Sequence, residues 1–216
     1  MKVIVLARAN EQVDVAEFRS WLCGSAAREL AQSLGSPGCI VNVADQPSPW
    51  SASGDTAAHS YDAVVEVWTD VVDAASAVRK QLGSHCRSVH IYQVDETVWK
   101  RPERPDRFNL VAVWNAPPGQ GTFETQRHWR EHAPLAVAIH HGATGYVQNW
   151  LAKPLSTDAP PHAGIAMLRF PSLAAIRDGL FRSEGDKATI ANDVADFVAD
   201  NHVLYTTEYI ISAGLP

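Results

Sequence analysis

The feature that most constrains this chain is an internal repeat, because the same order of predicted elements occurs in each half. Apolar runs at 2–7 and 108–114 open the two halves, and a polar turn and a helical pattern follow each run. The predicted helices cover roughly residues 13–34 and 122–140, and both end at corners with two glycines, a usual helix stop signal. The later predicted strands lie at 39–42, 61–68 and 89–99 in the first half, and at 146–149, 162–170 and 203–211 in the second. An alanine-rich helix precedes each last strand. The order β-α-β-β-α-β is therefore expected twice.

The strands of this repeat are apolar on both faces. A ferredoxin-like βαββαβ unit covers one face of its sheet with helices and leaves the other face bare. A half-exposed strand should alternate apolar and polar residues, yet 3–7, 110–114 and 165–168 do not alternate. A second sheet about 10 Å away would bury the bare face. We therefore predict an α+β fold in which two ferredoxin-like βαββαβ repeats form an intramolecular dimeric α+β barrel.

The repeat also sets the expected boundaries. Residues 1–100 form the first ferredoxin-like half and residues 108–216 the second. Between them, residues 101–107 contain two prolines and alternating charges, which is typical of a short, stiff and exposed linker.

Composition limits the partners of the chain. A net charge of −6 and a pI of about 5.8 do not suit a nucleic-acid-binding protein, which needs a basic surface. Cys23, Cys39 and Cys86 form no CxxC pair, so neither a disulfide framework nor a zinc knuckle is indicated. The N-terminal apolar run is too short for a signal peptide or a membrane span. We expect a cytoplasmic protein, monomer or homodimer, with a small-molecule substrate and neither nucleic acid nor membrane as partner.

One stretch of the second half carries a family resemblance. Trp129 is followed three residues later by His132, and then by Pro134 and Leu135. With Gly145–Asn149 and Gly164–Leu168, this stretch resembles an EthD-type domain of the dimeric α+β barrel superfamily. The first half resembles a degenerate copy, because Gly24 stands where His132 stands in the second half. The resemblance implies that an active-site pocket lies in the second half.

The resemblance implies the fold more narrowly than the reaction. Relatives in this superfamily include polyketide cyclases, dehydratases, cofactor-less monooxygenases, a muconolactone isomerase and haem enzymes. A shared fold does not fix a shared activity.

Three residues are the candidate catalytic groups. His128 and His132 lie four positions apart on the predicted helix, so they share a face. A neutral imidazole in an apolar pocket is a general base near neutral pH. Tyr146, on the following strand, could donate a hydrogen bond to a carbonyl oxygen as charge develops there. The alternative for His132 is a hydrogen bond to nearby backbone, and for Tyr146 a half-buried strand position.

Other residues are candidates for binding substrate. They are polar groups on strands or large aromatics that could form a pocket wall: Trp114, Trp129, Asn149, Phe170 and Glu208. Glu208 could instead orient a histidine or act as an acid. The alternatives are an exposed strand position for Glu208 and ordinary core packing for the aromatics.

Metal and cofactor signals are weak. Residues 128–132 fit the H-x-x-E-H pattern, but that zinc site needs a further carboxylate on a second helix. His140 lies on the same helix, and one helix rarely supplies three metal ligands. The sequence contains neither a phosphate-binding glycine loop nor a CxxCH haem-attachment motif. We predict no metal and no cofactor, with haem ligation by a histidine as the alternative.

These observations favour a cofactor-free lyase, cyclase or dehydratase. It would act by histidine-mediated proton transfer on a small apolar or aromatic carbonyl compound. One alternative is a cofactor-less monooxygenase acting on a similar substrate. Another is a non-catalytic small-ligand-binding or stress protein.

Overall fold

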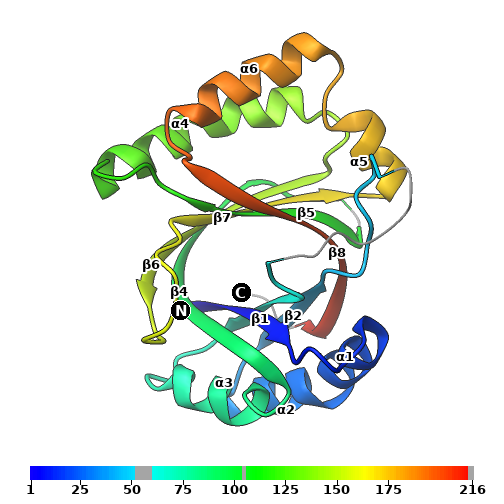
Figure 1. The fold of residues 1–216 in the computed structure, drawn as a ribbon, viewed down its shortest axis with the longest axis vertical. Helices are drawn as coiled ribbons and strands as arrows, with labels where there is room; N and C mark the ends of the chain where they lie inside the picture. Colours follow the sequence, from blue (N-terminus) through cyan, green and yellow to red (C-terminus); the bar gives the residue numbers. More distant parts are fainter. Residues whose placement is uncertain (52–59, 104–105, 214–216) are drawn as a thin grey trace.

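The computed structural model describes residues 1–51, 60–103 and 106–213, and eight strands in it close into one barrel (Figure 1). The order around the barrel is β1-β3-β2-β8-β5-β7-β6-β4, and every neighbouring pair is antiparallel. The strands are β1 (Lys2–Ala9), β2 (Gly38–Val43), β3 (Ala63–Trp68), β4 (Cys86–Lys100), β5 (Phe108–Asn115), β6 (Gly145–Pro154), β7 (Gly164–Phe170) and β8 (Asp200–Ala213). The predicted fold, an α+β barrel made within one chain, is confirmed.

The two halves join edge to edge. Their internal orders, β4-β1-β3-β2 and β8-β5-β7-β6, are the same, and the outer strands pair across the halves as β2 with β8 and β4 with β6. The registers match as well: Asn42 lies opposite Glu208, and Asn149 opposite Glu96. Closure leaves no unpaired edge, which removes a common route to aggregation.

The helices lie outside the barrel. Those of the first half are α1 (Val15–Trp21), a π-helical segment (Leu22–Ala26), α2 (Ala27–Ser33) and α3 (Ala74–Leu82); those of the second are α4 (Thr122–Ile139), α5 (Leu173–Gly179) and α6 (Glu184–Ala195). The first set covers one side of the barrel and the second set the opposite side (Figure 1). The first predicted helix is one helical run interrupted by a π segment, a rare irregularity that occurs mostly as a single turn inside an α-helix. Side chains cap several N-termini, as Ser183 does for α6.

The barrel wall explains the apolar strands. On β1, Val3 and Val5 pack in the cluster under the first-half helices, whereas Ile4 and Leu6 pack in the interior cluster. All four are fully buried. Alternate residues of a strand point to opposite faces, so a strand with helices outside and a filled barrel inside has no solvent face. The expectation of two-sided burial is confirmed.

One end of the barrel interior holds a ring of polar side chains to which every strand contributes. We call this set the polar ring: Lys2, Asn42, Glu66, Glu96, Asn109, Asn149, Arg169 and Glu208. Lys2 Nζ lies 2.7 Å from Glu66 Oε2 and also pairs with Glu96. Arg169 lies 2.8 Å from Glu208 Oε2. Burial raises the pKa of Glu208, while the Arg169 charge opposes that rise.

The opposite end holds a cluster of hydrogen-bonded rings. Tyr61 Oη lies 2.7 Å from His162 Nε2 and 3.2 Å from His90 Nδ1. His162 Nδ1 lies 2.7 Å from Asn115 Oδ1, so this nitrogen carries the proton. Burial lowers the pKa of His162 to about 4, and the nearby His202 and His90 add smaller effects in the same direction.

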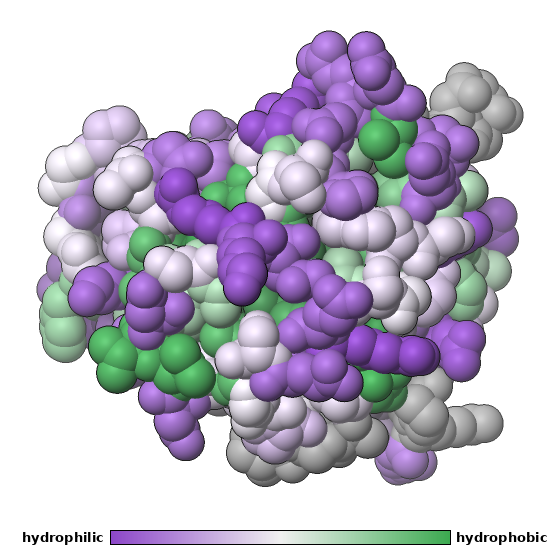
Figure 2. All heavy atoms as spheres, turned by 90° about the horizontal axis from the view of Figure 1, so that it is seen from below, coloured by the Kyte–Doolittle hydropathy of each residue, from purple (hydrophilic) through white to green (hydrophobic). Residues whose placement is uncertain are grey.

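The outer surface is mixed in polarity. Viewed from below, apolar residues reach the surface in separate groups among hydrophilic ones (Figure 2). Within the described residues, no helix combines the length and apolar character needed to cross a membrane.

Candidate functional site

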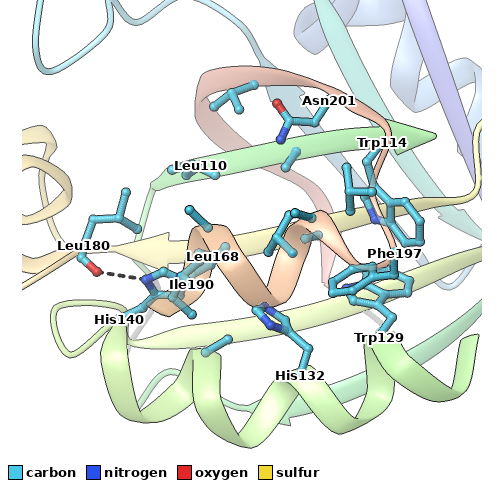
Figure 3. Close-up of a pocket in the computed structure, with 18 of the residues that line it drawn as sticks. Leu110, Trp114, Trp129, His132, His140, Leu168, Leu180, Ile190, Phe197 and Asn201 are labelled. Atoms are coloured by element: carbon cyan, nitrogen blue, oxygen red, sulfur yellow. Dashed lines mark hydrogen bonds between the residues drawn. The ribbon is translucent and has the colours of Figure 1, made fainter. Parts of the chain in front are cut away.

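A cavity of about 570 Å³ lies in the second half, between helices α4 and α6 and the outer face of β5, β7 and β8 (Figure 3). Its size is that of a small-molecule site. In α6, Ile190 is the one buried residue, because the inner side of this helix lies over the cavity. The walls are mostly apolar, with a few polar groups: His132, His140, Tyr146, Lys187, Asp200 and Asn201.

Aromatic rings close one end of the cavity. Trp114 meets Trp129 and Phe197 edge-on, at ring-centroid distances of 4.8 and 5.6 Å. The Trp114 ring lies against Gly164 of β7, where an added Cβ would come within 2.7 Å of the indole. Glycine is needed at this position because only a bare backbone lets the ring approach so closely. The predicted binding residues Trp114 and Trp129 therefore do line the cavity.

His132 faces the middle of the cavity from α4 (Figure 3). Its Nδ1 lies 2.6 Å from Asp193 Oδ2 on α6. An ionised carboxylate only accepts hydrogen bonds, so Nδ1 carries the proton and Nε2 keeps a free lone pair. Burial lowers the pKa of His132, and the neighbouring Asp193 opposes the shift. The site thus holds a neutral imidazole whose tautomer is fixed by a carboxylate.

His128 supports this pair from the next turn of α4. Its Nε2 lies 3.7 Å from Asp193 Oδ1, and its ring lies 5.1 Å from that of Phe197. About a quarter of its side chain is exposed, and it does not line the cavity. It is therefore placed to act on Asp193 and His132 rather than on a bound molecule.

Two more polar groups line the cavity on the other side of His132. His140 Nδ1 donates to the Leu180 carbonyl at 2.8 Å, which leaves Nε2 unprotonated, and burial lowers the pKa of His140. Tyr146 accepts a hydrogen bond from Gln148 Nε2 at 3.0 Å and keeps its own O–H for donation. Burial raises the pKa of Tyr146 to about 12, so it is a neutral donor.

The structure does not bring the remaining predicted binding residues to this cavity. Asn149 and Glu208 belong to the polar ring inside the barrel, where Asn149 Oδ1 accepts from Lys2 Nζ at 2.8 Å. Tyr146 and Asn149 are three positions apart on one strand, so they face opposite sides of the sheet. Phe170 is fully buried in the core under the second-half helices and is not at the cavity wall.

Two of the site's groups, Asp193 and Phe197, were missed by the sequence reasoning. They lie on α6 and just after it, a helix without a place in the predicted repeat. A signal was present: Ser183 followed by Glu184 and Asp186 is a helix-start pattern. Their spacing of four residues is also that of one helix face. The pairing with His132 depends on tertiary packing.

The same residues bear on metal and haem binding. Among the described residues, no group of three or more His, Cys, Asp or Glu could hold a metal ion. His132 could ligate a haem iron through Nε2, since metal-bound imidazoles commonly donate their other nitrogen to a carboxylate. Lys187 is the lining cation that could meet a propionate. Bound there, haem would supply redox chemistry at its iron.

Comparisons with known proteins agree with this architecture. Residues 117–201 match the EthD domain family, a segment that contains both His132 and Asp193. No curated protein matches the chain.

Three solved structures illustrate the likeness in fold. A monooxygenase candidate from Lactobacillus acidophilus NCFM is 10% identical, with TM-score 0.54, over 97% of this chain and 94% of that one. An anthrone oxidase-like protein is 12% identical, with TM-score 0.60, over 99% and 94%. A dye-decolorizing peroxidase from Bacteroides thetaiotaomicron VPI-5482 is 9% identical, with TM-score 0.53, over 95% and 92%. At such identities the likeness concerns the fold alone.

Proposed function

We propose that the chain is a cofactor-independent monooxygenase, because residues 117–201 match the EthD domain and hold a neutral imidazole, paired with a carboxylate, in an apolar cavity. Its substrate is a small aromatic or alicyclic carbonyl compound with an acidic C–H bond. The observation that carries the proposal is the His132 imidazole, with Nδ1 held by Asp193 and Nε2 unprotonated. An imidazole placed in this way is a general base.

The walls suggest how such a substrate lies. Its fused rings pack among Trp114, Trp129 and Phe197, since aromatic rings favour edge-on and offset contacts. The reacting carbon lies near His132 Nε2. The carbonyl oxygen receives the O–H of Tyr146, a donor that stabilises negative charge as it develops.

The reaction balances with dioxygen as the co-substrate. His132 removes one proton from a CH2 group conjugated with the carbonyl, and the electron pair delocalises onto that oxygen. The carbanion reduces O2, and a C–O bond forms to give a hydroperoxide after proton return from His132. Loss of the second C–H proton and cleavage of the O–O bond release water. One CH2 and one O2 thus become one C=O and one H2O.

The structural neighbours favour oxygen chemistry over the lyase prediction. One is named as an anthrone oxidase-like protein and another as a monooxygenase candidate. Anthrone is a ring ketone with the acidic CH2 that the proposed step requires. The same His–Asp pair would also serve a proton transfer without oxygen, so the two readings differ in whether O2 is consumed.

The test measures oxygen uptake with anthrone as the probe. Wild-type protein should raise O2 consumption and anthraquinone absorbance above the autoxidation rate. His132→Ala should lower the enzymatic rate by about 10²- to 10⁴-fold, the usual contribution of a positioned base. His141→Ala is the matched control, because His141 is exposed beside the end of the same helix.

Other results would assign the site differently. Full turnover by His132→Ala would exclude the proposed base. Deuterium exchange at the CH2 group without O2 uptake would favour the lyase or cyclase reading. Oxygen uptake that depends on added haem, together with a Soret band, would indicate a haem enzyme. Anthrone binding with neither exchange nor oxygen uptake would favour a binding protein.

A further inference from the structure

A second hollow, of about 480 Å³, adjoins the proposed substrate cavity. The two share Leu180, Phe181 and Lys187, so they run into one another. Leu180 and His140 lie at the end of the cavity away from Trp114 and Phe197, with His132 between the two ends (Figure 3). A ligand anchored among the aromatic rings can therefore extend past His132 toward this hollow.

The hollow is rich in cations. Among the described residues, the cations that line it are Arg177, Arg182 and Lys187. Each has a carboxylate nearby: Asp178 pairs with Arg177, Glu184 lies beside Lys187, and Asp186 accepts from the main-chain N–H of Arg182. The capacity to bind an anion therefore depends on which cationic side chains keep unpaired donors, and not on an excess of positive charge.

Arg182 and Lys187 keep hydrogen-bond donors for a ligand, whereas Arg177 is already paired. The Arg177 guanidinium is bound by its neighbour Asp178 through two contacts, of 2.7 and 3.1 Å. Lys187 Nζ lies 3.6 Å from Glu184 Oε2, and both side chains are largely exposed, so this pair is weak. Arg182 has no ion pair within the described part of the chain. Its guanidinium is well suited to bind a carboxylate with two parallel hydrogen bonds.

An aromatic side chain borders the same hollow. Trp50 is half exposed, and its ring meets Tyr205 edge-on at 6.1 Å. Tyr205 is partly buried and packs against the apolar core under the second-half helices. The hollow thus combines an apolar flank with cations, the pattern expected for the acidic end of an amphiphilic molecule.

We infer that the substrate is an amphiphilic anion. Its ring system fills the apolar cavity, and a carboxylate at its far end binds Arg182 and Lys187 in the adjoining hollow. The inference rests on the proposed function for the identity of the reacting carbon, whereas the binding preference follows from the two hollows alone.

Two naphthalene probes test this preference. 8-Anilinonaphthalene-1-sulfonate and N-phenyl-1-naphthylamine share one ring system and differ in the anionic group. Fluorescence titration of the full chain should show tighter binding of the anionic probe. Arg182→Gln and Lys187→Gln should each weaken the anionic probe about three- to tenfold and change the neutral probe less than twofold. Salt at about 0.5 M should remove most of the difference.

Two control variants make the result specific. Arg127→Gln should leave both affinities unchanged, because Arg127 lies outside the lining of both hollows and pairs with Glu131. Trp129→Ala should weaken both probes, since it removes a wall of the shared apolar cavity. Unchanged anionic affinity in Arg182→Gln and Lys187→Gln, or equal losses for both probes, would overturn the inference. These readouts are independent of oxygen uptake, so they stand or fall separately from the proposed reaction.

Discussion

Asp193 binds His132 across 61 positions of sequence, from a helix that has no counterpart between the strands of the first half as described. The first half also has Gly24 where the second has His132. The pair therefore belongs to the second half, on a scaffold that both halves build. This asymmetry places the candidate site on one side of a nearly symmetric barrel.

The His132–Asp193 pair predicts a pH profile. Burial holds the pKa of His132 below its ordinary value of 6.5, so the base form persists on the acidic side of that value. The acid limb of kcat/KM should lie below pH 6.5. Asp193→Asn removes the interactions that raise this pKa, so the limb should move to lower pH and the plateau should fall about tenfold or more. Glu131→Gln, at an exposed position on the same helix, should change neither. An acid limb at or above pH 6.5 would contradict the assignment.

The contact between Gly164 and Trp114 predicts a local packing effect. In Gly164→Ala, the new Cβ would lie 2.7 Å from the indole, so the ring must shift into the cavity. We expect a loss of about 1–3 kcal/mol in the free energy of unfolding, a shift in tryptophan fluorescence and weaker binding of both naphthalene probes. Gly185→Ala is the control, because its Cβ would meet only Ser183 Oγ, at 3.5 Å. If the two substitutions behave alike, the proposed contact is not important.

The buried His162 predicts acid destabilisation. Its pKa is about 4 in the folded chain and close to 6.5 when unfolded, so the unfolded state binds more protons between these values. Stability should be complete above pH 6.5 and should fall as the pH drops toward 4. The part due to His162 is at most about 3 kcal/mol. Urea unfolding across this range should show a flatter pH dependence in His162→Gln than in wild type. His141→Gln, at an exposed site, should keep the wild-type dependence; identical curves for all three proteins would exclude His162 as the cause.

The hydrogen bonds of the neutral His162 ring explain why protonation should destabilise the fold. Tyr61 can donate to His162 Nε2 only while that nitrogen has a free lone pair. Protonation of Nε2 would force the Tyr61 O–H to turn from His162 toward His90 Nδ1, and it would bury a charge beside His90 and His202. The neutral form of His162 is therefore favoured in the folded chain.

The polar ring predicts a large cost for removing one partner. Lys2 is buried and contacts Glu66, Glu96 and Asn149. Lys2→Met leaves the carboxylate of Glu66 buried without a cation, so we expect a loss of about 3–5 kcal/mol in the free energy of unfolding. Adding Glu66→Gln to this variant should recover more than half of that loss. Arg87→Met breaks an exposed pair with Glu11 and should cost less than about 1 kcal/mol. Equal effects of Lys2→Met and Arg87→Met would show that the ring contributes little.

The fold was predictable because its signals are local and repeated. Two-sided apolar strands and a duplicated element order require a second sheet on the bare face, and the closed barrel supplies it. The π segment at Leu22–Ala26 had no such signal. The predicted repeat also did not contain α6, the helix that covers the cavity.

The geometry of the candidate site was predictable where it depends on a single helix or strand. The four-residue spacing of His128 and His132 placed both on one helix face, and each lies within reach of Asp193. Strand alternation separates Tyr146 from Asn149, and applied strictly it would have moved Asn149 to the barrel interior. The Asp193 contact and the burial of His162 depend on how distant elements pack, which no local pattern encodes.

The pairing of β2 with β8 and of β4 with β6 has a consequence for how such a chain can change over generations. Main-chain atoms form the hydrogen bonds of these strand pairs, so the pairing depends little on which side chains project outward. The first half can therefore keep its strands in the barrel without a His–Asp pair, provided that the core under its helices stays filled. A gene that holds both halves can in this way carry the candidate site in one half and use the other half as the rest of the barrel wall.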